Sequence, residues 1–230
     1  MTSAKAIPAI GDGFDGPFAG TLRPGAAGRG ETPGDRVVPC FTPGTMVTTR
    51  AGKRAVETLR PGDMLLTRDR GFQPVVWRGM RRVPGAALSP ETAPVTIRAG
   101  ALGPGQPERD MTVSPGHRML STDRDLLRGV GEPEALVEAR ALTGLPGIGR
   151  VVDGPVGYVH LLMEKHEVIL AENTWTESLR LTPTLLRALS AAGVDIGQRL
   201  ARAGDRTAAT AQSPARHCLT VTEAAQGLRV

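Results

Sequence analysis

The feature that most constrains the fold of this chain is a series of short apolar runs between Val37 and Leu179, each followed by a turn signal. The runs are rich in Val, Ile, Leu and Thr, which favour extended backbone, and glycine or proline marks most of the turns. They occupy residues 45–49, 64–67, 75–77, 95–97, 111–113, 158–163 and 167–171. Many short strands joined in this way, without alternating strand and helix units, predict an all-β body of barrel or sandwich type.

The two ends of the chain show other patterns. Residues 1–36 are rich in Gly and Pro and have little hydrophobic periodicity, so we expect a flexible leader there. Leucines recur at helical spacing within residues 183–202, which predicts one kinked helix or two short ones. The chain after Ala203 reads as a polar tail. The expected organisation is therefore a leader over 1–36, a β-domain over 37–179, and a helical extension with a polar tail over 180–230.

The charge and composition argue against several function classes. The formal net charge of +5 comes from scattered arginines interleaved with acids, and aromatic residues make up only 3% of the chain. A groove that binds phosphates and stacks bases is therefore not expected. No stretch reaches the roughly 18 consecutive apolar residues of a transmembrane helix, and the N-terminus lacks the apolar core of a secretory signal. We expect no nucleic-acid partner, no membrane span and a cytoplasmic location by default, with non-classical export as the alternative.

Cys40 is one of only two cysteines, the other being Cys218, and this pair does not predict a disulfide framework. A free cysteine is either a small buried side chain or a nucleophile, and its sequence context decides between these roles. Three blocks of sequence favour chemistry. They are residues 37–45 with 56–63 (VVPCFTPGT and VETLRPGD), residues 112–118 (TVSPGHR) and residues 158–168 (YVHLLMEKHEV).

In this order and spacing the three blocks resemble the Hint domain, the hedgehog/intein-type autoprocessing module, and in particular bacterial Hint-domain proteins. The resemblance covers roughly residues 37–179. It implies a compact, twisted all-β Hint fold, followed by the short helical extension. Cys40 stands at the first position of the family's domain, and Ser114 and His117 stand at the two ends of its T-x-x-H motif.

The resemblance also implies a role for each of these side chains. Cys40 is the nucleophile, His117 is the general acid for the departing amide nitrogen, and Ser114 is the hydrogen-bond partner of the scissile amide or the oxyanion. His166 is an auxiliary acid or base. Two further side chains from the same blocks are secondary candidates: Thr112 and His160.

The expected reaction is cleavage of the Pro39–Cys40 peptide bond. The sulfur attacks the Pro39 carbonyl and exchanges the amide for a thioester, and the departing nitrogen needs a proton because amide resonance is lost. Water or an external nucleophile then releases residues 1–39, so the chain's own N-terminal segment is the substrate and no cofactor is expected. Full splicing is not expected, because Glu177-Ser178 stands where splicing inteins carry a His-Asn pair.

Two alternatives stay open at this point. A Hint scaffold that no longer cleaves would serve as a structural or interaction module with an unknown protein partner, and the hindered acyl group of Pro39 favours that interpretation. A zinc module is the other, because four side chains could be ligands and the six-residue spacing of the last two would give them one face of a strand. These side chains are Cys40, His117, His160 and His166. No metal is expected, because the close ligand spacings of dedicated zinc sites are missing.

Overall fold

The computed structural model describes residues 38–151, 154–191 and 211–228, so the expected leader over 1–36 lies outside the described residues. The all-β prediction is confirmed, since strands make up most of the regular structure in these ranges. The strands are β1 (Met46–Thr49), β2 (Gly52–Ala55), β3 (Met64–Thr67), β4 (Gly71–Val83), β5 (Val95–Ile97), β6 (Met111–Val113), β7 (Arg118–Ser121), β8 (Ala135–Glu138), β9 (Ile148–Arg150), β10 (Val156–Met163), β11 (Val168–Ala171), β12 (Thr174–Glu177) and β13 (His217–Leu219).

Helices are few and short in the described ranges. The α-helices are α1 (Pro183–Ala191) and α3 (Val221–Gly227), and the 3-10 turns are η2 (Val56–Thr58), η3 (Gly85–Ala87) and η4 (Ala139–Ala141). The helix predicted within 183–202 is present as α1, and the part of that prediction beyond Ala191 lies outside the described residues. Thr182 caps α1, because its hydroxyl accepts a hydrogen bond from the Leu185 amide at 3.1 Å.

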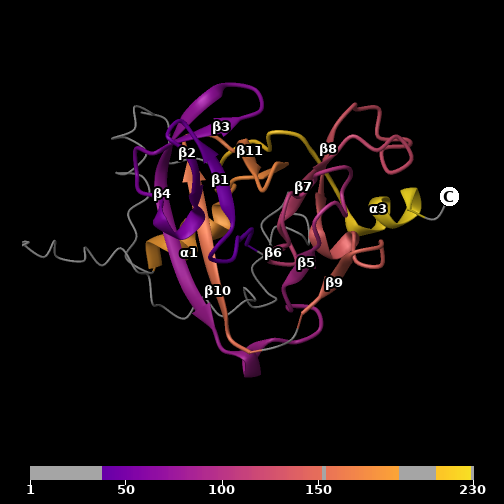
Figure 1. The fold of residues 1–230 in the computed structure, drawn as a ribbon, viewed down its shortest axis with the longest axis horizontal. Coiled ribbons are helices and arrows are strands. Elements are labelled where there is room, and N and C mark those ends of the chain that lie inside the picture. Colours follow the sequence, from indigo (N-terminus) through magenta and orange to yellow (C-terminus); the bar gives the residue numbers. More distant parts are fainter. Residues whose placement is uncertain (1–37, 152–153, 192–210, 229–230) are drawn as a thin grey trace, which may run out of the picture.

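The described strands form two sheets. The larger runs in the order β10-β4-β3-β1-β11-β12-β7-β8-β13, with β2 paired to β1, and the smaller runs β6-β5-β9. The large sheet is curled, because β3 pairs with β4 on one side and with both β1 and β11 on the other. Figure 1 shows β4 and β10 side by side along one half of the molecule, with β5, β7, β8 and β9 in the other half.

The long antiparallel pair of β4 and β10 decides where the side chains of the site lie. In its register Arg81 faces Tyr158 and Gly79 faces His160. Directly opposed residues of a pair point to the same side of the sheet, so one face carries Arg81, Tyr158 and His160. The intervening residues, such as Val159, point to the opposite side and join the main hydrophobic core.

Two further apolar clusters lie on the face of β4 and β10 that carries His160. One contains Trp77 and Leu162 and is covered by Leu185 and Leu189 of α1. The other consists of three buried side chains: Cys40, Val83 and Tyr158. The amphipathic helix α1 therefore closes the molecule over the face on which Cys40 is buried.

The chain after residue 210 differs from the polar tail that the sequence predicted. Residues 211–228 form β13, which pairs in parallel with β8, and α3, which is capped by reciprocal bonds between Thr220 and Glu223. Leu219 and Ala224 are buried against the main core. The sequence pattern missed this segment because a three-residue strand and a seven-residue helix are too short to show a period.

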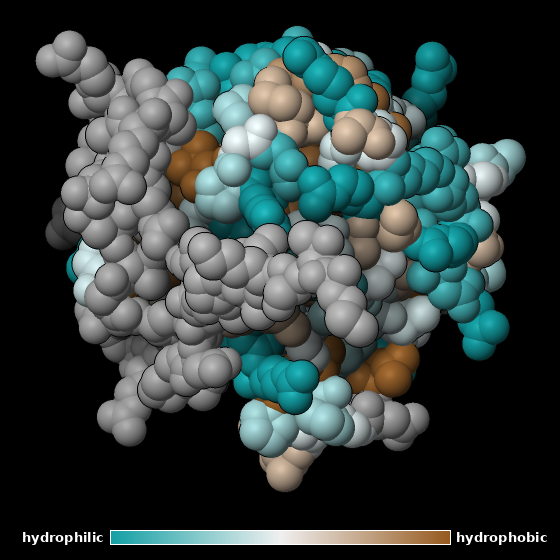
Figure 2. Space-filling view, turned by 60° about the vertical axis from the view of Figure 1, so that its left-hand side comes forward, coloured by the Kyte–Doolittle hydropathy of each residue, from teal (hydrophilic) through white to brown (hydrophobic). Residues whose placement is uncertain are grey.

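The face of the described part seen in Figure 2 is largely polar. In the view of Figure 2 hydrophilic residues cover much of the described surface, and the most hydrophobic residues form small separate spots. Val151 and Val221 are the large apolar residues exposed among the described residues. Within the same residues, no helix combines the length and the apolar composition needed to cross a membrane.

We predict that Gly79→Ala destabilises the β4–β10 pair. An added Cβ would lie 2.2 Å from the Trp77 ring, which packs directly over Gly79. Overpacking of this kind costs about 1–3 kcal/mol of the free energy of unfolding. The measurement is the midpoint of urea denaturation, with Gly149→Ala on β9 as the control, because an added Cβ there meets no atom within 4 Å. Equal midpoints for the two variants would contradict the packing described here.

Candidate active site

Cys40 is fixed in place by the residue that follows it. The amide and carbonyl of Phe41 form two hydrogen bonds with Val159 of β10, at 2.9 and 2.8 Å. The carbonyl of Cys40 accepts a third bond from the amide of Ser114, at 2.9 Å. Cys40 is fully buried. Its backbone is thus held between β10 and the turn that follows β6. Neither of these two segments can shift relative to Cys40 without breaking these hydrogen bonds.

Both polar ends of the Pro39–Cys40 peptide bond have a side-chain partner. The amide of Cys40 donates to Ser114 Oγ at 3.0 Å, and the same hydroxyl donates to the Val38 carbonyl at 3.0 Å. At the other end, Nδ1 of His160 lies 3.2 Å from the Pro39 carbonyl oxygen. Because a carbonyl can only accept, Nδ1 of His160 carries the proton. This peptide bond is therefore oriented by a hydroxyl and an imidazole from two different strand regions.

The Cys40 thiol lies against the same imidazole. Its sulfur is 3.5 Å from Nδ1 and 3.8 Å from Nε2 of His160, and 3.0 Å from the Val38 carbonyl oxygen, to which it donates. With the proton of His160 on Nδ1, Nε2 holds a lone pair. One ring therefore brings a donor to the carbonyl next to Cys40 and an acceptor near the thiol.

Burial keeps both partners of this contact neutral. It raises the pKa of Cys40 to about 11, with the positive charge of Arg81 acting in the opposite direction. It lowers the pKa of His160 to about 3, and the charge of Arg81 adds to that decrease. The arrangement is accordingly a thiol beside a neutral imidazole and not an ion pair.

His117 immediately precedes β7, and its ring lies edge-on to Phe41 at 4.4 Å between centroids. Its Nε2 is 2.6 Å from Thr176 Oγ1, and that hydroxyl gives its own proton to the Arg118 carbonyl at 2.8 Å. Nε2 must therefore donate, which leaves a lone pair on Nδ1. This Nδ1 is buried and has no hydrogen-bond partner among the described residues. Burial lowers the pKa of His117 to about 4, so the ring is neutral.

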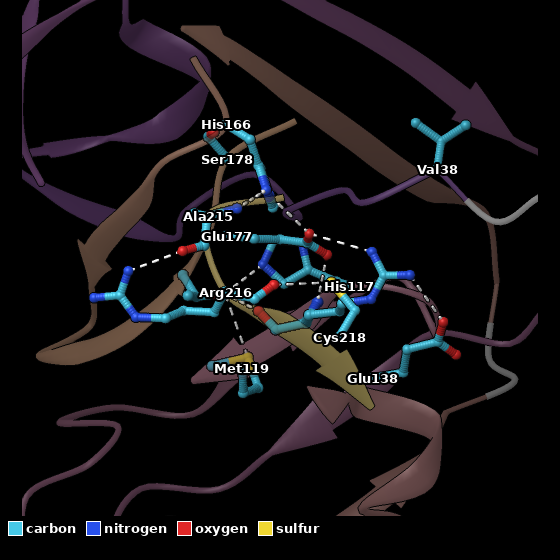
Figure 3. Close-up of polar contacts among 12 residues, drawn as sticks. Val38, His117, Met119, Glu138, His166, Glu177, Ser178, Ala215, Arg216 and Cys218 are labelled. Atoms are coloured by element: carbon cyan, nitrogen blue, oxygen red, sulfur yellow. Dashed lines mark hydrogen bonds and ion pairs between the residues drawn. The ribbon is translucent and has the colours of Figure 1, made fainter. Parts of the chain in front are cut away.

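His166 belongs to a different cluster. Its Nε2 is 3.0 Å from a carboxylate oxygen of Glu177, and its Nδ1 accepts from the Ala215 amide at 3.0 Å. Figure 3 shows the His166 ring between Ala215 and the Glu177 carboxylate, with His117 beside this network. In the described ranges no contact joins His166 to Cys40. His160 and His166 do not share a strand, because β10 ends at Met163 and His166 lies in the turn that follows.

Glu177 holds this cluster together, although from the sequence it was noted only at the position of the splicing His-Asn pair and was expected to have no role in the site. It accepts a bond from the Arg118 amide at 2.8 Å and forms an ion pair with the Arg118 side chain at 3.4 Å. Burial acts to raise the pKa of Glu177, but the charge of Arg118 and the hydrogen bond with His166 outweigh it and hold the pKa at about 2. The sequence offered one sign of a buried role for Glu177, which is an acid at an inward position of a short strand. The neighbouring residues gave no further indication that it binds Arg118 and His166.

Thr112 is placed outside the reacting groups. Its hydroxyl is 2.8 Å from that of Thr96 across the β5–β6 pair, and its carbonyl accepts from the amide and the hydroxyl of Thr42. The structure thus brings Cys40, Ser114 and His160 into direct contact, whereas Thr112 only connects β6 to Thr96 and Thr42 through hydrogen bonds. In the described part of the chain, no three His, Cys, Asp or Glu side chains are arranged to hold a metal ion.

Comparison with known proteins gives one family and several solved structures. The family model of the Hint domain matches residues 39–183. The crystal structure of the gp41-1 intein is similar at 12% identity and a TM-score of 0.36, over 60% of this chain and 97% of that one. A bacterial intein-like domain from Clostridium thermocellum is similar at 16% identity and a TM-score of 0.39, over 60% and 96%. A variant of the AceL NrdHF class 3 split intein is similar at 18% identity and a TM-score of 0.37, over 61% of this chain and 97% of that one. No curated protein matches the sequence.

We predict that the stabilising effect of Glu177 fades at acid pH. Its pKa is depressed to about 2 in the folded chain, against about 4.3 in an unfolded one. The contribution is thus fully present above the unfolded pKa and is lost as the pH falls through the folded one. At pH 7, Glu177→Gln should cost about 3–5 kcal/mol of unfolding free energy, because a buried ion pair is broken.

Urea denaturation of the wild type and Glu177→Gln between pH 7 and pH 3 measures this effect. The gap in stability between the two proteins should narrow as the pH falls. Glu132→Gln is the control, because Glu132 is exposed and its substitution removes the same charge from the surface. A gap that stays constant over this pH range would show that the ionised Glu177 is not the source of the stability.

Proposed function

This chain belongs to the Hint-domain family, and from that premise we propose that it cleaves its own Pro39–Cys40 peptide bond through a thioester, without full splicing. The family supports autoprocessing of adjacent segments in general. One observation carries the more specific proposal: three side chains converge on this single peptide bond. Cys40 supplies the sulfur, Ser114 accepts from the amide, and His160 contacts the carbonyl oxygen.

The first step is an N-to-S acyl shift. The Cys40 thiol passes its proton to Nε2 of His160 while the sulfur bonds to the Pro39 carbonyl carbon, and Nδ1–H of His160 stabilises the oxygen as it gains negative charge. The carbon–nitrogen bond then breaks and the nitrogen of Cys40 takes up a proton. The proton lost by sulfur equals the one gained by nitrogen, so the step needs no other reagent.

His117 is assigned the transfer of the proton to the departing nitrogen. Its Nδ1 is buried without a partner among the described residues, and Thr176 fixes the tautomer that leaves this nitrogen free. This nitrogen takes up the proton that His160 received from the thiol and delivers it to the departing nitrogen of Cys40, so both imidazoles return to their neutral state. Ser114 orients the amide that is protonated.

His166 is assigned an auxiliary role at a distance. It acts through Glu177, whose negative charge raises the pKa of His117 against the larger effect of burial. The thioester is finally cleaved by water or an external nucleophile, which releases residues 1–39. The domain proposed to carry this chemistry spans about 37–179, with the leader before it as its substrate and the segment 180–230 as a structural extension.

A second candidate function is a Hint scaffold that does not cleave and binds a partner. The observation that favours it is the neutral state of the thiol. With a pKa of about 11 for Cys40 and about 3 for His160, proton transfer between them is uphill in the ground state. Cleavage must then couple proton transfer to bond formation, and a chain that has lost this coupling would stay intact.

We predict that a thiol reagent releases residues 1–39 from the full-length chain. The measurement is the intact mass of freshly purified protein with and without dithiothreitol or hydroxylamine. Cys40→Ala should abolish the release, because it removes the nucleophile. Cys218→Ser is the matched control, since it removes the other cysteine and should cleave like the wild type. A full-length mass under every condition would rule out cleavage by the isolated chain and favour the scaffold.

We also predict that His117→Ala slows the release by about 100- to 10,000-fold, the range for loss of a general acid. Thr112→Ser is the control, because it keeps the hydroxyl that meets Thr96 outside the reacting groups. The rate constants of thiol-induced release give the comparison. Similar rates for His117→Ala and the control would remove His117 from the mechanism and leave His160 as the acid.

A further inference from the structure

Arg81 is buried on the face of the β4–β10 pair that carries the site. It lies on β4 opposite Tyr158, two residues from Gly79, which faces His160. The residue is only 8% exposed, and its guanidinium carbon lies 5.3 Å from the centroid of the Tyr158 ring. Tyr158 in turn packs in one cluster with Cys40. A permanent positive charge is thus held inside the molecule next to the thiol.

This charge has no anionic partner among the described residues. Nε and Nη1 of Arg81 are buried without a hydrogen-bond acceptor, and no ion pair with a described carboxylate involves this side chain. The buried Arg118 is different, because it forms ion pairs with Glu138 and Glu177. Burying a cation without a carboxylate partner is costly, and the cation–π contact with the Tyr158 ring offsets part of that cost.

The surroundings of Arg81 increase the electrostatic effect of its charge on neighbouring groups. A small cavity beside the side chain is lined by His160, Val38 and Trp77 and by leucines of α1. Little water screens a charge in such a setting, so its effect on a neighbouring group is larger than at the surface. The Cys40 sulfur can become an anion during the proposed reaction, and the charge of Arg81 acts on it.

The other titratable groups around Cys40 cannot replace Arg81. Tyr158 and His160 on β10 and His117 before β7 are kept neutral by burial, and Glu177 on β12 carries a negative charge that opposes ionisation of the thiol. Arg81 is the charged group that lowers the pKa of Cys40 against the effect of burial, and a hydrogen bond with the neutral Ser114 hydroxyl acts in the same direction.

We propose that Arg81 supplies the positive charge that stabilises the anion formed at Cys40 when the thiol loses its proton to His160. This inference rests on the proposed cleavage and adds a residue to it. The charge stays unpaired in the intact chain and gains an anionic partner only as the thiol loses its proton, before the carbon–sulfur bond is complete. Arg81 is thus a preorganised electrostatic group, which lowers the barrier without being consumed.

The test uses the full chain with Cys218→Ser, so that Cys40 is its single thiol, and three further variants in that background. Arg81→Met removes the charge and keeps the aliphatic bulk, Arg81→Lys keeps the charge, and Arg82→Met removes the same charge from the exposed neighbour. The ionisation of Cys40 is followed between pH 8 and pH 12, a range that includes its raised pKa of about 11, by the ¹³Cβ resonance of labelled cysteine. The rate of thiol-induced release is measured over the same variants.

Arg81→Met should keep Cys40 protonated to a pH at least about one unit higher, which corresponds to a tenfold change in ionisation. It should also slow any release by about 100-fold, as does loss of one preorganised donor. Arg81→Lys and Arg82→Met should remain near the parent in ionisation. Because an unpaired buried charge is removed, Arg81→Met should unfold at the same or a higher urea concentration, whereas a structural arginine would lower that midpoint.

Equal ionisation of Cys40 in the parent and in Arg81→Met would overturn the inference. If Arg81→Met does not fold, Arg81→Gln replaces it, and the same comparison decides. The two proposals fail separately. A chain that never cleaves but whose thiol ionises at higher pH without Arg81 retains the electrostatic role and loses the cleavage, and a chain that cleaves with unchanged ionisation retains the cleavage alone.

Discussion

The antiparallel pairing of β4 with β10 is the interaction on which the rest of the structure depends. Its register opposes Arg81 to Tyr158 and Gly79 to His160, and the alternation of side chains then sends these groups to one face and Val159 to the main core. Phe41 joins the edge of the same pair through its bonds with Val159, which fixes Cys40 on the face with His160. A shift by one residue would bury the wrong set of side chains and separate the thiol from the imidazole.

Burial sets the electrostatics of the site. The thiol and the two nearby imidazoles are all neutral because a charge in this interior has no water around it. The unpaired guanidinium of Arg81 is the exception. In the proposed reaction this neutrality makes proton transfer and bond formation interdependent. The same burial that stabilises the fold therefore determines how the proposed chemistry has to proceed.

The second buried cluster serves the fold and connects it to the last part of the chain. Glu177 joins the ion pair with Arg118 to His166, and His166 receives the Ala215 amide. Gln212 adds hydrogen bonds to the carbonyls at the end of β10. The segment that contains Gln212 and Ala215 and leads to β13 is thus hydrogen-bonded to the end of β10 and the turn that follows it, so it packs as part of the folded domain.

The sequence by itself determined the all-β class, the positions of most strands, helix α1, and the candidate residues Cys40, Ser114 and His117, because short-range patterns and local motifs encode them. Only the tertiary structure decided how the histidines divide: His160 lies on the thiol and His166 pairs with Glu177, although both come from one block of sequence. Only the structure revealed Arg81, since an arginine in a strand gives no sign of whether a carboxylate will meet it. Strand register and the contacts between residues far apart in the chain set these features, and no local pattern records them.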